Sequence, residues 1–332
     1  MSRIAILGAG SWGTALAIHL ARAGRTVRLW ARDSELAAQI AATRNNPRYL
    51  SGVSLPPGVE PTSCVETAVA DAQFVVVAVP SHGLRSVVRL ASGVLATDAI
   101  VVSATKGLET ESFRRMSQVI EEETAARFSV VVLSGPSFAA EVAAGLPAAL
   151  LAASSDQQAA MRVQEQFRSR GLRLYASDDV AGVEIGGALK NVIAIAAGVV
   201  DGLGLGHNAM AALITRGLAE ISRLACAEGG RRDTLAGLSG LGDLVVTCTG
   251  ALSRNRHVGL ELGRGRALAD ILASMHMVAE GVRTTDAALA LGARHGLELP
   301  IAAQMSAVLD GRTSPLEAVE TLMGRRQRAE VE

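Results

Sequence analysis

The side chains of this 332-residue chain that are best suited to chemistry are two lysines and an aspartate. Lys190 lies in an apolar helical stretch, where a charged amine is costly unless it has partners or a lowered pKa. Lys106 follows a predicted strand, and Asp243 lies on a glycine-flanked turn. We predict that Lys190 transfers a proton near neutral pH, with Lys106 nearby to stabilise negative charge and Asp243 positioning Lys190 or a substrate hydroxyl. The alternative for Lys190 is a lysine that snorkels from the edge of its helix.

A second group of residues is suited to binding phosphate. Ser253, Arg254 and Asn255 stand at the start of a predicted helix, where Ser253 can cap the helix and Arg254 offers a fork of donors. The free amides of the helix N-terminus add to this site. Gly135 and Ser137 follow another predicted strand and offer close backbone approach and a hydroxyl at the start of the next helix. Together with Lys106 they predict a small phosphorylated ligand such as a triose phosphate.

The N-terminal glycines predict a dinucleotide site. The run Gly8-Ala-Gly10-Ser-Trp-Gly13 lies directly between a predicted strand and a predicted helix. Gly8 permits a tight turn, Gly10 lets backbone amides approach a pyrophosphate, and Gly13 lets the helix pack closely on the strand. The helix N-terminus supplies partial positive charge for the pyrophosphate. This motif predicts binding of a nicotinamide dinucleotide.

The end of the second predicted strand bears on the choice of cofactor. An NAD-binding protein usually has an acidic residue here, but this chain has Ala31 and Arg32 before Asp33. Arg32 could stack on adenine and pair with a 2′-phosphate, so we expect NADP(H) to be preferred and NAD(H) to be accepted. Two alternatives stay open: Arg32 is a solvated strand-end arginine, or a shift of one residue brings Asp33 to the ribose.

The elements that must position these residues form an α/β pattern over the first 180 residues. Several continuously apolar runs alternate with helical patterns, which predicts a Rossmann-type, doubly wound parallel sheet. The predicted strands are Ile4–Leu7, Val27–Trp30, Phe74–Val79, Ile100–Ser103, Val130–Leu133, Ala149–Ala152 and Leu172–Tyr175. The predicted helices are Thr14–Ala23, Ser34–Thr43, His82–Ala91 and Phe113–Ala126, and Gly24 is placed to end the first of them.

From about Asp178 the strand signal fades and helical patterns continue to the C-terminus. The predicted helices are Val180–Val200, Ala209–Glu228, His257–Gly263, Ala267–Ser274, Thr284–His295, Ile301–Leu309 and Pro315–Met323. We therefore divide the chain into an NAD(P)-binding domain, residues 1–180, and an α-helical substrate-binding domain, residues 181–332.

Composition excludes several classes of protein. A hydrophobic fraction of 49% with 32 basic and 32 acidic residues argues against a disordered chain, and gives no electrostatic reason to expect nucleic acid or an anionic membrane as partner. No uncharged apolar run reaches the 18 or so residues of a membrane span. Three cysteines without a C-x-x-C pair fit a reducing cytoplasm, and we read Cys248 as a small buried apolar residue. No cluster predicts a bound metal.

The motifs together resemble bacterial NAD(P)-dependent glycerol-3-phosphate dehydrogenase along nearly the whole chain. The matching stretches are GAGSWGTALA, VPSH, ATKGLE, SGPSFAAEVAAGLP, GGALKNVIAIAAG, TRGLAE, GLGDLVVTCT, SRNR and Glu280-Gly281. The resemblance implies interconversion of sn-glycerol 3-phosphate and dihydroxyacetone phosphate for phospholipid synthesis in the cytoplasm, with Lys190 as proton acceptor in oxidation and donor in reduction. It also implies a substrate site of Lys106, Gly135, Ser137, Lys190, Asp243, Ser253, Arg254 and Asn255. The implied cofactor contacts are Ser11, Trp12, Arg32, Tyr49, Lys106, Ala139, Arg254, Val278 and Glu280.

Two other interpretations stay open on the sequence. The chain could be another two-domain Rossmann dehydrogenase, of the 3-hydroxyacid dehydrogenase or ketopantoate reductase type, although such an enzyme has no use for two phosphate-binding elements. It could also be a non-catalytic NADPH sensor, which would leave Lys190 in its apolar helix without a purpose. Families of this shape are often dimers, so a homodimer is one expected state.

Overall fold

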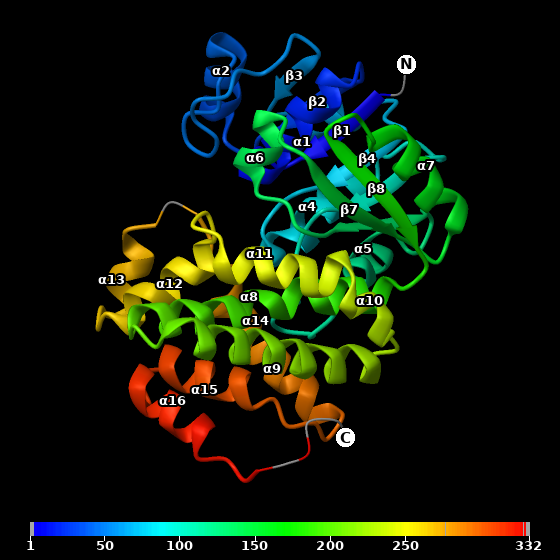
Figure 1. The fold of residues 1–332 in the computed structure, drawn as a ribbon. Helices are drawn as coiled ribbons and strands as arrows, with labels where there is room; N and C mark the ends of the chain where they lie inside the picture. The colour runs from blue at the N-terminus through cyan, green and yellow to red at the C-terminus, as the bar shows by residue number, and fades with distance from the viewer. Residues whose placement is uncertain (1–2, 276, 328, 330–332) are drawn as a thin grey trace.

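The first half of the chain is built on one eight-stranded sheet (Figure 1). The computed structural model describes residues 3–275, 277–327 and 329. The strand order is β3-β2-β1-β4-β5-β6-β7-β8, and every neighbouring pair is parallel except β6 and β7. The strands are β1 Arg3–Leu7, β2 Thr26–Trp30, β3 Val59–Thr62, β4 Phe74–Val77, β5 Ile100–Ser103, β6 Val130–Ser134, β7 Ala148–Ala153 and β8 Leu172–Ser177.

Helices cover both faces of this sheet, because alternate side chains of each strand point to opposite faces. In β1, Ile4 and Ile6 join a core with α1, α2 and α7, whereas Ala5 and Leu7 join a second core with α3 and α4. The seven helices of this part are α1 Ser11–Arg22, α2 Ser34–Thr43, α3 Val65–Val69, α4 Ser81–Ser92, α5 Met116–Glu123, α6 Ala139–Ala144 and α7 Gln157–Phe167. The predicted doubly wound α/β fold is confirmed.

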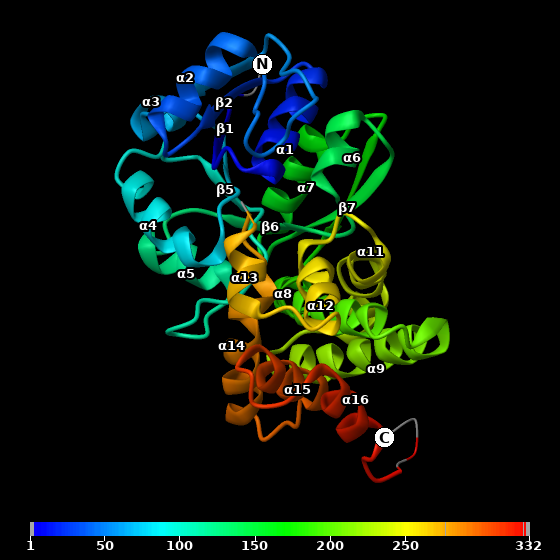
Figure 2. The same cartoon turned by 90° about the vertical axis from the view of Figure 1, so that its left-hand side faces the viewer.

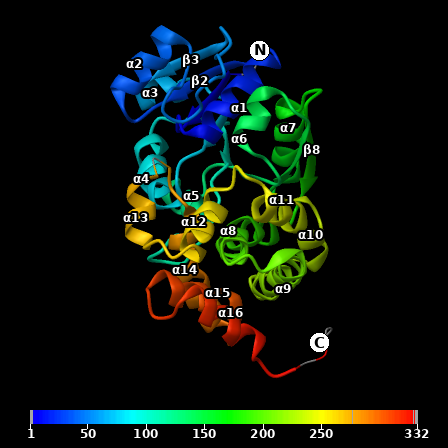
Figure 3. The same cartoon turned by 60° about the vertical axis from the view of Figure 1, so that its left-hand side comes forward.

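The rest of the described chain is helical and lies below the sheet in Figures 1 and 3. It comprises α8 Val180–Gly202, α9 Gly206–Ala227, α10 Arg232–Ala236, the π-helical turn η1 Leu238–Gly242, α11 Asp243–Thr249, α12 Arg254–Gly263, α13 Leu268–Ala273, α14 Glu280–Arg294, α15 Pro300–Leu309 and α16 Pro315–Met323. Every helix predicted here from Asp178 onward exists, with ends that differ by a few residues.

Helix α8 is the centre of the helical part, and Figure 2 shows it between the sheet and the outer helices. It packs against α9, α11, α12 and α14. It is long and apolar enough to cross a membrane, but its most apolar 18-residue window is wholly buried inside the protein. The apolar character of α8 is therefore explained by packing within the fold.

Glycines let α8 and α12 approach with backbone against backbone. A Cβ on Gly198 would lie 2.0 Å from the Arg256 carbonyl oxygen, and one on Gly259 would lie 1.8 Å from the Ile195 carbonyl oxygen. No side chain fits at either place, because real Cβ atoms never approach so closely. This contact fixes α12, which carries the predicted phosphate site, against α8, which carries Lys190.

The predicted secondary structure missed several elements and misplaced the ends of one helix. Strand β3 was not predicted, since it is a short edge strand that contains Pro61, and proline weakens a strand signal. The helix predicted over Phe113–Ala126 spans only Met116–Glu123, because Phe113 and Ala126 have positive φ angles. The antiparallel β6–β7 pair and the helices α3, α6, α7, α10 and α11 were also missed.

The α8–α12 contact makes a prediction about stability. We expect Gly259→Ala to destabilise the protein by about 3 kcal/mol or more, because the new methyl group forces two helices apart. Gly83→Ala is the matched control, since Gly83 also lies in a helix but has open space where the Cβ would be. The control should be neutral or raise stability by up to about 1 kcal/mol. Thermal unfolding followed by circular dichroism compares the two, and equal midpoints would contradict the packing argument.

Candidate active site

The glycine turn after β1 has the geometry that its sequence predicts. Gly8 has a φ of +122° and passes so close to the residue that follows β4 that a Cβ would lie 2.5 Å from the Ala78 carbonyl oxygen. A Cβ on Gly13 would lie 1.9 Å from the carbonyl oxygen of Gly8, so α1 starts tightly against the turn. A Cβ on Gly10 would meet nothing within 4 Å, and no side chain caps the N-terminus of α1.

These features fit a dinucleotide. The strand order reverses between β1 and β4, and in such sheets ligands bind at this point beyond the carboxyl ends of the strands. The uncapped amides of α1 begin there and offer donors and partial positive charge to a pyrophosphate. The side-chain nitrogen of Trp12, the second residue of α1, is buried without a hydrogen-bond partner among the described residues.

The two residues after β2 that bear on cofactor choice differ in their contacts: Asp33 is held by hydrogen bonds, whereas Arg32 has no partner among the described residues. Asp33 caps α2 by accepting hydrogen bonds from two backbone amides and pairs with Arg48 at 2.9 Å. The hydrogen bond from the Leu36 amide lowers the pKa of Asp33. Arg32 is exposed and has no hydrogen bond or ion pair with the other described residues. The alternative register, with Asp33 facing a ribose, conflicts with this capping role.

Arg32 lies far from Lys106 along the same sheet edge. Strands β2 and β5 are separated by three inter-strand spacings, which is roughly 14 Å. Between them, the Ser11 hydroxyl at the start of α1 donates to the Tyr49 carbonyl oxygen at 2.7 Å. The predicted cofactor residues are thus spread along the edge, as an extended dinucleotide requires.

Asp243 joins the two candidate lysines in one buried cluster. Its Oδ1 accepts a hydrogen bond from the Lys190 ammonium at 2.5 Å, and its Oδ2 accepts one from the Lys106 ammonium at 2.6 Å. Asp243 is 1% exposed and Lys190 is 6% exposed. Lys190 therefore does not snorkel to solvent, and the three charged groups predicted from separate motifs form one unit.

Each ammonium group in this cluster retains one free N–H. Lys190 also donates to the Thr247 hydroxyl at 2.8 Å, and Lys106 also donates to the Gly135 carbonyl oxygen at 2.9 Å. An ammonium has three donors, so one remains on each lysine. Because both lysines bond to the same carboxylate, the two ammonium groups lie close together.

The pKa of Lys190 is lowered to about 8. Burial is the largest cause, since it penalises the charged amine, and the nearby Lys106 ammonium lowers the pKa further. The Asp243 carboxylate acts in the opposite direction. A lysine with this pKa can give or take a proton near neutral pH, as the sequence predicts.

Glycines in α8 and the π-helical turn bring the cluster together. A Cβ on Gly186 would lie 2.8 Å from the Ser239 carbonyl oxygen in η1, and one on Gly187 would lie 2.9 Å from the Ser134 hydroxyl of β6. Helix α8 therefore lies against both the sheet and η1. Asp243 is the first residue of α11, directly after η1, and not part of the simple turn that we predicted.

The start of α12 carries the predicted phosphate group. The Ser253 hydroxyl caps this helix by accepting a hydrogen bond from the Arg256 amide. Arg254 is exposed and makes no hydrogen bond or ion pair with other described residues. Although its side chain reaches solvent, the protein atoms packed around Arg254 lower its pKa by desolvation, and the carboxylate of Glu280 offsets part of this effect. The guanidinium and the first amides of α12 are thus available to an anion.

Asn255 also has a structural role beside the substrate contact that the sequence analysis expects. Its side chain donates to the Asn191 side chain at 3.0 Å and accepts a hydrogen bond from the Gly281 amide at 2.9 Å. It is 8% exposed, so it joins α12, α8 and α14 inside the protein. Its backbone amide and one side-chain hydrogen are what it can offer a substrate.

The loop after β6 corrects a second expectation. The Ser137 hydroxyl does not cap the next helix but donates to the Gly135 carbonyl oxygen at 3.0 Å. Gly135 has a φ of +132°, which favours glycine, and Ala139 is the first residue of α6. This loop directs the Gly135 carbonyl toward Lys106.

The structure also brings in two residues that the sequence analysis missed. Thr247 lies one helical turn after Asp243 and bonds to Lys190, a relation that the i, i+4 spacing could have indicated. Ser81 of α4 donates two hydrogen bonds to Glu280, the first residue of α14, which the sequence analysis had named together with Val278. No local pattern in the sequence predicts a contact across 199 positions.

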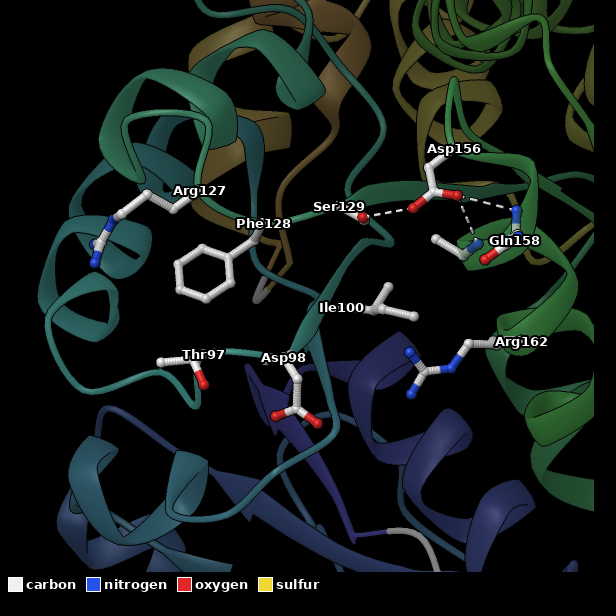
Figure 4. Close-up of a pocket in the computed structure, with 11 residues that line it drawn as sticks. Thr97, Asp98, Ile100, Arg127, Phe128, Ser129, Asp156, Gln158 and Arg162 are labelled. Atoms are coloured by element: carbon white, nitrogen blue, oxygen red, sulfur yellow. Dashed lines mark hydrogen bonds between the residues drawn. The ribbon is translucent and has the colours of Figure 1, made fainter.

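Figure 4 shows a pocket of about 170 Å³ outside this site. Its lining includes residues just before β5 and β6 and the start of α7, at the amino ends of the strands. The Lys106–Asp243–Lys190 cluster lies beyond the carboxyl end of β5, so the pocket is separate from it. Within the described part of the chain, no group of three or more His, Cys, Asp or Glu side chains is placed to hold a metal ion.

Comparison with known proteins supports one family over the whole chain. Residues 3–160 match the model of the NAD-dependent glycerol-3-phosphate dehydrogenase N-terminus, and residues 179–320 match that of its C-terminus. Proteins named glycerol-3-phosphate dehydrogenase (NAD(P)+) from Koribacter versatilis and Acidobacterium capsulatum are 54% and 53% identical. Each alignment covers at least 99% of both chains.

Solved structures agree with these matches. The structure of glycerol-3-phosphate dehydrogenase from Coxiella burnetii is 40% identical, covers 98% of this chain and 99% of its own, and superposes with a TM-score of 0.94. A ketopantoate reductase structure from Ralstonia eutropha reaches a TM-score of only 0.60 at 19% identity, so it shares the fold alone. The chain belongs to the NAD-dependent glycerol-3-phosphate dehydrogenase family.

Proposed function

We propose that this protein reduces dihydroxyacetone phosphate to sn-glycerol 3-phosphate with NADPH, reversibly, and that Lys190 is its proton donor. The observation that carries the proposal is the Lys106–Asp243–Lys190 cluster, in which one buried carboxylate holds two ammonium groups close together and leaves one donor on each for a substrate oxygen. It lies between a dinucleotide-type glycine turn and a helix N-terminus with a free arginine. The ketopantoate reductase and sensor interpretations offer no role for this combination.

The nicotinamide, when bound, supplies the hydride that adds to C2 of the substrate. As C2 is reduced, its carbonyl oxygen gains negative charge and needs a proton. The free N–H groups of Lys190 and Lys106 stabilise this charge, and Lys190 transfers its proton to the oxygen to complete the alcohol. Asp243 accepts no proton in this scheme, because its charge holds both lysines in position. Oxidation of the alcohol follows the same path in reverse, with neutral Lys190 as acceptor.

The start of α12 positions the other end of the substrate. Arg254 and the first amides of α12 bind the phosphate, and this fixes C2 relative to the lysines. Ser253 maintains the helix start, and Asn255 ties it to Asn191, the neighbour of Lys190. Lys106, Gly135 and Ser137 then line the opposite side of the substrate.

Cofactor binding follows the carboxyl edge of the sheet. We assign the pyrophosphate to Gly8, Gly10, Gly13 and the start of α1, where Ser11 and Trp12 lie. Arg32 would hold the 2′-phosphate of NADPH, and Ala139, Val278 and Glu280 would contact the nicotinamide half. The free guanidinium of Arg32 supports a preference for NADPH with acceptance of NADH.

We also propose that the protein works in the cytoplasm as a homodimer, with the cofactor and substrate domains divided at residues 180 and 181. Strand β8 ends at Ser177 and α8 begins at Val180, which supports this division. Leu241 and Val245 are 38% and 39% exposed beside a hollow on η1 and α11, which supports an interface. Light scattering measures the mass in solution.

Replacing Lys190 tests the proton-transfer role. We expect Lys190→Ala to lower kcat by about 100-fold or more, because the reaction loses its acid, while the Kd of NADPH stays near the wild-type value. In the wild type, kcat/KM for reduction should fall as pH rises through about 8, since the ammonium donor is lost. Steady-state assays across pH check both, and a variant that keeps most of its kcat would remove Lys190 from the mechanism.

Replacing Arg254 tests the phosphate site. We expect Arg254→Ala to raise KM for dihydroxyacetone phosphate strongly, because a charge-assisted contact to the phosphate is lost. Dihydroxyacetone without phosphate, a poor substrate, should be affected much less. Arg264→Ala is a suitable control, since Arg264 is exposed at the other end of α12. Equal losses on both substrates would show that Arg254 serves the cofactor or the fold.

Replacing Arg32 tests cofactor choice. Arg32→Ala should weaken NADPH binding by about 1–3 kcal/mol, the range for a lost hydrogen-bond partner of a charged group. NADH lacks the 2′-phosphate, so its affinity should change much less. Fluorescence titration with each cofactor measures the two dissociation constants. If both rise equally, Arg32 acts by stacking and the specificity argument is wrong.

A further inference from the structure

Ser81 connects the sheet domain to the start of α14. It is the first residue of α4, is 4% exposed, and directs both of its donors at Glu280. The Ser81 amide donates to Glu280 Oε1 at 3.1 Å, and the Ser81 hydroxyl donates to Glu280 Oε2 at 2.6 Å. The carboxylate thus caps a 12-residue helix of the other half of the protein.

The loop that carries Lys106 packs against the Ser81–Glu280 contact. Gly107, with a φ of +153°, passes so close that a Cβ would lie 2.8 Å from the Ser81 Cβ and 3.4 Å from Glu280 Oε2. Ser81, Gly107 and Glu280 come from three segments that are distant in the sequence. They come together beside Lys106, which donates to Asp243.

The segment around Glu280 also contacts the start of α1, where the cofactor turn lies, and the start of α12, where the substrate phosphate is expected. The Ser11 hydroxyl, at the start of α1, lies 3.0 Å from the Met277 sulfur. On the other side, the Gly281 amide donates to Asn255, whose side chain donates to Asn191. Residues 277–281 therefore lie between the cofactor turn and the substrate helix, with Ser81 fixing their middle.

We propose that Ser81 is a positioning residue for cofactor binding, and that it acts by holding Glu280 and its segment in the binding conformation before the cofactor arrives. A segment that is ordered in advance lowers the entropy cost of binding. The proposal rests on the proposed function, because it takes the cofactor to be a nicotinamide dinucleotide.

The test measures NADPH binding to the substrate-free protein by fluorescence titration. Ser81→Ala removes one hydrogen bond to a carboxylate, and we expect the Kd of NADPH to rise by about fivefold to tenfold. At saturating NADPH, kcat should stay near the wild-type value. Ser86→Ala is the matched control, because Ser86 lies on the same helix and donates only to the nearby Gly83 carbonyl oxygen. The control should bind as the wild type does.

A double-mutant cycle separates action through Glu280 from other roles. In the Glu280→Gln background, Ser81→Ala should change the Kd much less than in the wild type, because the two residues act as one unit. An additive effect would overturn the proposal, since Ser81 would then act independently of Glu280. An unchanged or tighter Kd for Ser81→Ala, including one with a lowered melting temperature, would also overturn it. If wild-type protein binds no NADPH or does not reduce dihydroxyacetone phosphate, the proposed function itself fails.

Discussion

The carboxylate of Asp243, buried between two ammonium groups, is the interaction on which the site depends. Burial alone makes a charged lysine unfavourable, and a second lysine nearby adds repulsion. One shared carboxylate offsets both effects and fixes the geometry, with one donor left on each amine. The result is a lysine with a pKa of about 8, still charged at neutral pH yet able to release its proton. Without Asp243, burial and the Lys106 ammonium would lower the pKa of Lys190 further, and both amines would lose the acceptor that holds them in place.

The rest of the fold keeps this cluster in place. Helix α8 can carry Lys190 between the sheet and α12 because glycines at its contacts remove the side chains that would hold the elements apart. The same glycine-lined contact places Arg254 at a set position relative to the cluster. Cofactor and substrate elements come from different halves of the chain, so the domain joint is part of the site. Ser81 and Glu280 extend that joint to the cofactor edge.

Local patterns in the sequence predicted the residues of the site better than their contacts. The glycine turn, the apolar setting of Lys190 and the serine cap of α12 are short-range features, and the structure confirms each of them. The intramolecular partners of the Asn255 and Ser137 side chains were not predicted, because these partners depend on how helices and loops meet in space. Strand β3 was missed because Pro61 and its short length hide an edge strand. The Ser81–Glu280 contact joins positions 199 residues apart, and no single-sequence pattern encodes it.

The most direct test of this account is the pKa of Lys190 itself, measured by NMR on protein labelled at the lysine Cε and assigned with Lys190→Arg. The wild-type amine should titrate near pH 8. Lys106→Met should raise the pKa of Lys190, since a repelling charge is removed and Asp243 is left to Lys190 alone. Asp243→Asn should lower it, because burial and Lys106 then act without opposition. A Lys190 pKa that stays near 10.5, or that does not respond to either substitution, would contradict the central role of the shared carboxylate.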